Sequence, residues 1–83
     1  MQDPEYQHLL RKSRDAKRGG IDAWCCQSTG ERVAVALVLN RADWLREMDY
    51  TLAEAIERTG PLWLSYALRV ERQLRDEPPD GPA

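Results

Sequence analysis

The run VAVALVL at residues 33–39 constrains this chain more than any other feature, because every residue in it is apolar. In a strand, successive side chains point to opposite faces, so a strand of this composition needs cover on both sides. As a helix, the stretch 62–68 is apolar on nearly every side, with Ser65 as its clearly polar residue. Two such elements are hard to enclose in 83 residues, a length that holds a single core.

The composition is that of a folded domain. Hydrophobic residues make up 42% of the chain and charged residues 31%, whereas a disordered chain lacks the apolar residues that offset its conformational entropy. We expect one globular domain over residues 1–76 and a disordered tail over residues 77–83, which are rich in proline. No stretch approaches the roughly 20 apolar residues that cross a bilayer, and residues 1–4 lack the basic-then-apolar order of a secretory signal. These features indicate a cytoplasmic protein without a membrane segment.

The first helix is predicted over residues 4–18. Asp3 suits the N-cap, and Pro4 suits the first helical position, where no N–H is needed. Gly19 and Gly20 supply a left-handed stop. Three more helices are predicted toward the C-terminus: residues 41–48 after Asn40, residues 52–59 with Thr51 and Glu54 at capping-box spacing and Gly60 at the end, and residues 61–76 opened by Pro61.

The segment after the first helix allows two interpretations. Ser28 and Glu31 have the spacing of a helical capping box, which predicts one long helix over residues 31–48. Residues 21–27 and 32–39, however, are two short runs rich in β-branched residues, separated by a segment whose glycine can take the left-handed conformation of a turn. We therefore predict a β-hairpin and an α+β fold, in which an N-terminal helix and two or three later helices pack on the hairpin. The alternative is an all-α bundle.

Few side chains are of the kinds that carry chemistry. Cys25 and Cys26 are neighbours and cannot cross-link distant parts of the chain, and a zinc site needs more ligands than these cysteines and His8 provide. A cysteine nucleophile activated by histidine needs an orienting group and an oxyanion site, which no motif indicates. No glycine-rich phosphate loop follows a predicted strand. We therefore predict no catalytic, metal-binding or cofactor-binding residues, no small-molecule substrate, and a protein that is not an enzyme.

The net charge is −2, but the first predicted helix contains a basic run that includes Arg11, Arg14, Lys17 and Arg18. Such a run could contact phosphates, and the release of counterions would make that binding salt-dependent. Alternatively, Lys17 and Arg18 complement the helix dipole while the others solvate an exposed face. The negative net charge and the lack of aromatic residues within the run favour this second interpretation. Nucleic-acid binding is therefore the alternative hypothesis for function.

The leading hypothesis is a non-enzymatic interaction or regulatory module. A two-stranded sheet alone is marginal and leaves edges that invite pairing, and the apolar start of the last helix also needs cover. We therefore expect a homodimer, or a protein partner that covers Trp63, Leu64 and Tyr66. Tryptophan is enriched among the anchors of protein interfaces, although Trp24, Trp44 and Trp63 could equally be core residues.

The segment CCQSTGERVAVALVLNRADWL, followed by YTLAEAIERTG, resembles small uncharacterised bacterial proteins carried on genomic islands and other mobile elements. The resemblance extends over residues 25–63. It implies a bacterial, cytoplasmic setting and an accessory role, and it carries over no activity and no functional residue.

Overall fold

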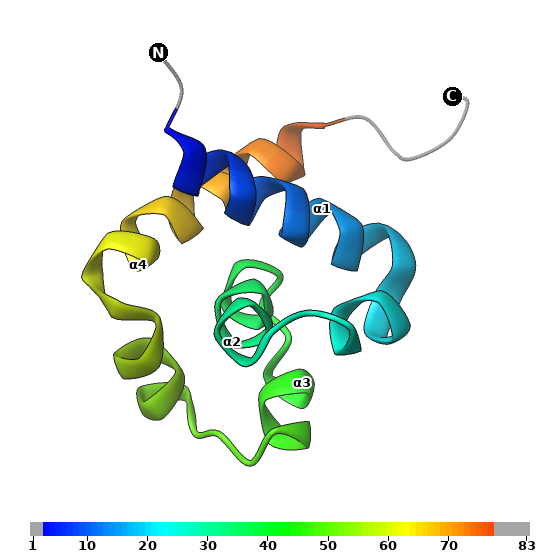
Figure 1. Ribbon diagram of the computed structural model, residues 1–83, viewed down its shortest axis with the longest axis vertical. Coiled ribbons are helices and arrows are strands. Elements are labelled where there is room, and N and C mark those ends of the chain that lie inside the picture. Colours follow the sequence, from blue (N-terminus) through cyan, green and yellow to red (C-terminus); the bar gives the residue numbers. More distant parts are fainter. Residues whose placement is uncertain (1–2, 78–83) are drawn as a thin grey trace.

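The computed structural model describes residues 3–77 as four helices: α1 (Pro4–Cys25), α2 (Thr29–Val38), α3 (Ala42–Glu47) and α4 (Leu52–Asp76). No strand occurs among these residues, so the predicted α+β fold with a β-hairpin is wrong and the all-helical alternative is the correct class. Figure 1 shows α2 nearly end-on at the centre, with the other helices arranged around it. Apart from Glu77, the predicted disordered tail lies outside the described residues.

Helix α2 forms because its N-terminus is capped and its apolar residues are buried, apart from the partly exposed Leu37. The Ser28 hydroxyl accepts a hydrogen bond from the Glu31 N–H (3.3 Å), and the Glu31 carboxylate accepts one from the Ser28 N–H (2.9 Å). Val33 and Val35 are fully buried. A valine loses roughly 0.5 kcal/mol of helix propensity relative to alanine, much less than the about 1.5–3 kcal/mol gained by burying its side chain. The apolar run was predicted to be a strand that needs cover on both faces. In the structure the run forms a helix instead, and the surrounding helices provide that cover.

The two long helices bend around α2 at glycines. Gly20 (φ 71°, ψ −157°) interrupts α1, and Gly60 (φ 82°, ψ 163°) interrupts α4. Residues with a Cβ atom rarely adopt positive φ, which explains the glycine at each bend. The predicted helix breaks at these two positions are therefore confirmed. In each case the chain returns to a helix after the break, and Pro61 suits the start of the second half of α4.

The turns around α3 end at residues with positive φ. Asn40 (φ 55°) follows α2, and Asp49 (φ 59°) follows α3. Asn40 was the expected cap of the next helix, but Arg41 takes that position, because asparagine is one of the few residues that tolerate the left-handed conformation needed to end α2. The predicted capping box at the start of α4 is confirmed, since the Thr51 hydroxyl accepts a hydrogen bond from the Glu54 N–H (3.1 Å).

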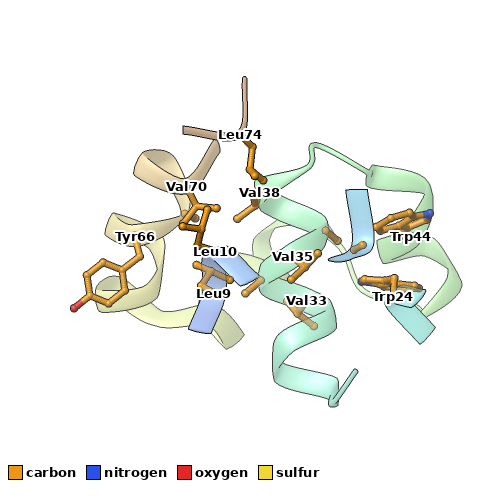
Figure 2. Close-up of a cluster of buried hydrophobic side chains, with 14 of the residues drawn as sticks. Leu9, Leu10, Trp24, Val33, Val35, Val38, Trp44, Tyr66, Val70 and Leu74 are labelled. Atoms are coloured by element: carbon orange, nitrogen blue, oxygen red, sulfur yellow. The ribbon is translucent and has the colours of Figure 1, made fainter. Parts of the chain in front are cut away.

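One hydrophobic core joins the four helices. Its largest fully buried side chains are Trp24 and Trp44, whose rings stack at one end of the core with centroids 4.9 Å apart (Figure 2). The Trp24 indole N–H donates to the carbonyl oxygen of Arg32 (2.8 Å), so its polar atom is satisfied inside the protein. At the other end, Tyr66 packs edge-on against Tyr6 with ring centroids 5.9 Å apart.

The four helices form a flat disc with dimensions of 37 × 30 × 18 Å. Figure 1 is viewed along the shortest of these dimensions, so α2 runs through the thickness of the disc and the outer faces of α1 and α4 form much of its rim. None of the described helices is both long enough and apolar enough to cross a membrane.

Candidate protein-interaction surface

Exposed apolar side chains are concentrated on α4. Of the five large hydrophobic residues that are exposed in the described part of the chain, four belong to this helix. Leu52 (60% exposed) and Ile56 (44%) precede the bend at Gly60, whereas Leu62 (53%) and Leu68 (49%) follow it. Single exposed leucines are normal on a soluble protein. Their concentration on one helix makes α4 the candidate for contact with a partner.

Arginines flank the apolar side chains in the second half of α4. Arg69 and Arg72 are exposed, and Arg72 follows Leu68 by four positions, so these two side chains share a face of the helix. Arg75 continues the basic character, although its guanidinium lies 4.0 Å from the Glu71 carboxylate in an exposed pair. The outer face of this half thus combines leucine with positive charge.

The three predicted partner-binding residues do not form one exposed surface. Tyr66 is only 8% exposed, and its hydroxyl donates a hydrogen bond to the Asp3 carboxylate. This bond lowers the pKa of Asp3 and raises the pKa of Tyr66. Trp63 and Leu64 are partly exposed, and the Trp63 ring packs edge-on against His8. Trp63 and Leu64 can therefore border a docking surface, whereas Tyr66 belongs to the contact between α1 and α4.

Leu62 and Leu68 lie within the apolar stretch 62–68, but they were not predicted to be partner-binding residues. For Leu68 the helical period held a usable signal: Val70 and Leu74 lie on the buried face of α4, and Leu68 lies about 200° around the helix from Val70. For Leu62 no such signal exists, because its exposure depends on the direction that the helix takes after the bend at Gly60.

Two residues of the predicted basic run tie α1 to the end of α4. Arg14 donates to both oxygens of the Glu77 carboxylate, with Nη2–Oε2 at 2.5 Å and Nε–Oε1 at 3.2 Å. This guanidinium lowers the pKa of Glu77. Lys17 Nζ donates to the carbonyl oxygen of Leu74 (3.0 Å) in the last turn of α4. Carbonyl groups in the last turn lack an N–H partner within the helix. Both cations therefore have a structural role.

Arg11 belongs to a second network, at the N-terminus of α2. Its Nη2 lies 3.2 Å from His8 Nδ1, and His8 Nε2 lies 2.6 Å from the Glu31 carboxylate. Burial acts to raise the pKa of Glu31, but hydrogen bonds from the Ser28 N–H and from His8 outweigh it and lower this pKa. Arg18, the remaining residue of the predicted set, is exposed close to the bend of α1. The structure therefore spreads the four predicted nucleic-acid-binding residues over separate local contacts.

Side chains suited to metals or redox chemistry are scattered. Cys25 and Cys26 are both exposed at the end of α1. Among residues 3–77, no group of three or more histidine, cysteine, aspartate or glutamate side chains is arranged to hold a metal ion. No protein-family model, curated protein or solved structure matches the chain at a significant level.

Proposed function

We propose that this chain is a non-enzymatic protein-interaction module of the cytoplasm, which docks a partner protein on the outer face of the second half of α4. The observation that carries the proposal is the exposure of Leu62 and Leu68 on a helix whose inner face already contributes to the core. Exposed leucines contribute little to folding, whereas burial against a partner would remove their apolar area from water.

The partner that fits this face has apolar side chains flanked by acidic ones. An amphipathic helix of this kind would cover Leu68, and its acidic residues would lie beside Arg72, which shares that face of α4. Leu62 lies about 120° around the helix from Leu68 and would border this contact. A second copy of the chain is the main competing occupant, because the first half of α4 carries exposed Glu54 and Glu57 beside exposed leucine and isoleucine.

Capture of proteins from the host lysate by the tagged full chain tests the proposal. We expect a stoichiometric protein that survives nuclease treatment, is lost with Leu68→Gln and is retained with Leu52→Gln, the matched control in the first half of α4. Analytical ultracentrifugation of the purified chain addresses the second copy, since a dimer that Leu68→Gln dissociates would identify the chain itself as the occupant. If both variants capture the same proteins as the unmodified chain, the outer face of α4 is not the docking surface.

Nucleic-acid binding through Arg11, Arg14, Lys17 and Arg18 is the competing function. It predicts that recovered material disappears with nuclease, that affinity falls steeply between low and physiological salt, and that Arg18→Gln weakens binding. Arg14 and Lys17 are already engaged by the end of α4. The net charge is −2, and Arg11, Arg14 and Lys17 take part in separate local contacts, which is why we rank this function second.

A further inference from the structure

A polar groove lies between the start of α1 and the second half of α4. Its volume is about 540 Å³, within the roughly 300–1,000 Å³ of small-molecule sites. Side chains from both helices line it, among them Gln7 and Arg14 of α1 and Arg69 and Gln73 of α4. Two guanidinium groups and two amides thus meet in one depression, which is a donor-rich environment suited to an anionic ligand.

One of these guanidinium groups already holds a carboxylate. Arg14 donates two hydrogen bonds to the Glu77 carboxylate. This is the bidentate geometry with which arginine commonly binds carboxylates. Glu77 is the first residue after α4 and has an extended backbone (φ −73°, ψ 145°), so its side chain can move away without breaking a helical turn. The two side chains are 36% and 30% exposed, so water reaches the pair and can solvate both charges when they separate. The Glu77 carboxylate is therefore exchangeable.

The second guanidinium, that of Arg69, lies over the ring of Tyr6. Arg69 Cζ lies 4.6 Å from the centroid of the Tyr6 ring, and Tyr6 is itself 9% exposed with its hydroxyl donating to the Gln73 side-chain oxygen (2.6 Å). A guanidinium stacked on a ring can still donate its N–H groups in its own plane. Asp3 brings an opposing charge to the groove, but its carboxylate is engaged by the Tyr66 hydroxyl and by a backbone N–H.

We propose that this groove binds a ligand through carboxylate groups held by Arg14 and Arg69, and that Glu77 is an internal competitor which leaves Arg14 when the ligand enters. The carboxylates belong either to a small dicarboxylic acid or to the glutamates of a peptide, since the chemistry at the two guanidinium groups is the same. Arg69 lies between this groove and the proposed docking surface, but the groove lining contains none of the exposed leucines of α4. Leu68→Gln therefore distinguishes the two sites.

Titration of the full chain with glutarate, and separately with a triglutamate peptide blocked at both ends, tests the proposal. Binding is followed by the ¹⁵N chemical shifts of the backbone and of the arginine side chains. We expect Arg14→Gln and Arg69→Gln each to weaken binding about tenfold, as for the loss of a charged hydrogen bond. Glu77→Gln should strengthen binding about two- to sixfold, because it removes a weak internal competitor.

Arg72→Gln is the matched control, since Arg72 is exposed on the same helix but does not line the groove. It should change the affinity by less than about twofold, the effect of removing one surface charge that solvent and salt screen, and Leu68→Gln should leave the affinity unchanged. Binding of both probes supports a small acid, and binding of the peptide alone supports a peptide ligand. Failure of both probes to bind, equal losses for Arg72→Gln and Arg69→Gln, or no gain with Glu77→Gln would overturn the proposal.

Discussion

The stacked tryptophans show how much of this fold depends on a few large side chains. Trp44 is 2% exposed and stacks on the Trp24 ring. The Arg41 guanidinium lies over the Trp44 ring, with its Cζ 4.5 Å from the ring centroid. We expect Trp44→Ala to lower the free energy of unfolding by about 3–5 kcal/mol, a large share of the roughly 5–15 kcal/mol typical of a small domain. Urea unfolding followed by far-UV circular dichroism measures the loss.

Trp63→Ala is the control for this substitution, because Trp63 is partly exposed, packs against the edge of the core and meets the His8 ring edge-on. It should cost clearly less than Trp44→Ala, and equal losses would contradict the assignment of Trp44 to the core. The sequence alone does not separate these tryptophans. Which of them is buried depends on where the helices meet, and neighbouring residues along the chain do not determine that.

The residues that cap or break helices were predicted most accurately from the sequence. Asp3, Thr51 and Gly60 act through bonds and dihedral angles within a few residues, so their effect can be read locally. The hairpin prediction failed because a short run that is apolar throughout has no periodicity to separate strand from helix. The capping box of Ser28 and Glu31 carried the decisive information, and the content of β-branched residues was given more weight.

Removal of the caps tests this conclusion. Ser28→Ala and Thr51→Ala should each destabilise the protein by about 1 kcal/mol, since each hydroxyl satisfies a backbone N–H at a helix start. Ser65→Ala, at an exposed position within α4 where the hydroxyl bonds the Leu62 carbonyl (2.6 Å), should change stability by less than about 0.5 kcal/mol. Denaturant midpoints of the three variants make the comparison. No loss for Ser28→Ala would argue against a helix starting at this residue.

The bend of α4 at Gly60 makes a second prediction for an element. Its dihedral angles (φ 82°, ψ 163°) are essentially restricted to glycine. Gly60→Ala should therefore destabilise the protein by about 1–3 kcal/mol. Gly30→Ala is the matched control: Gly30 lies in α2, an added Cβ would be 3.9 Å from its nearest neighbour, the Arg58 side chain, and alanine should be neutral or stabilising by up to about 1 kcal/mol. Thermal unfolding compares the two, and equal effects would contradict the bend.

The arrangement of the whole molecule explains why less apolar surface is exposed than the apolar run at residues 33–39 led us to expect. The run was correctly expected to need cover on every side, but the cover comes from within the chain, because the bends at Gly20 and Gly60 let α1 and α4 surround α2. Sequence patterns report which residues are apolar. They do not report the directions of helices after a bend, and those directions decide that residues 33–36 are buried while Leu62 and Leu68 are exposed.

Acid should destabilise the molecule as a whole, because several carboxylates that cap helices or join elements have lowered pKa values. These residues are Asp3, Glu31, Asp43, Glu54 and Glu77. For Asp43, two hydrogen bonds from Arg41 lower the pKa from 3.8 to about 2. A group whose pKa is lower in the folded chain than in the unfolded chain stabilises the fold above its unfolded pKa. That contribution is lost as the pH falls through the folded pKa.

The thermal midpoint should therefore be nearly constant above about pH 5 and decline between the ordinary glutamate pKa of 4.5 and the Asp43 value of about 2. Asp43→Asn should remove part of this decline, and the difference should shrink in high salt because the Arg41–Asp43 pair is exposed. Circular dichroism melts across this pH range measure both effects. A midpoint that stays constant down to about pH 2.5 would contradict this prediction, since it would mean that the ionised carboxylates of Asp3, Glu31, Glu54 and Glu77 contribute nothing measurable to folding.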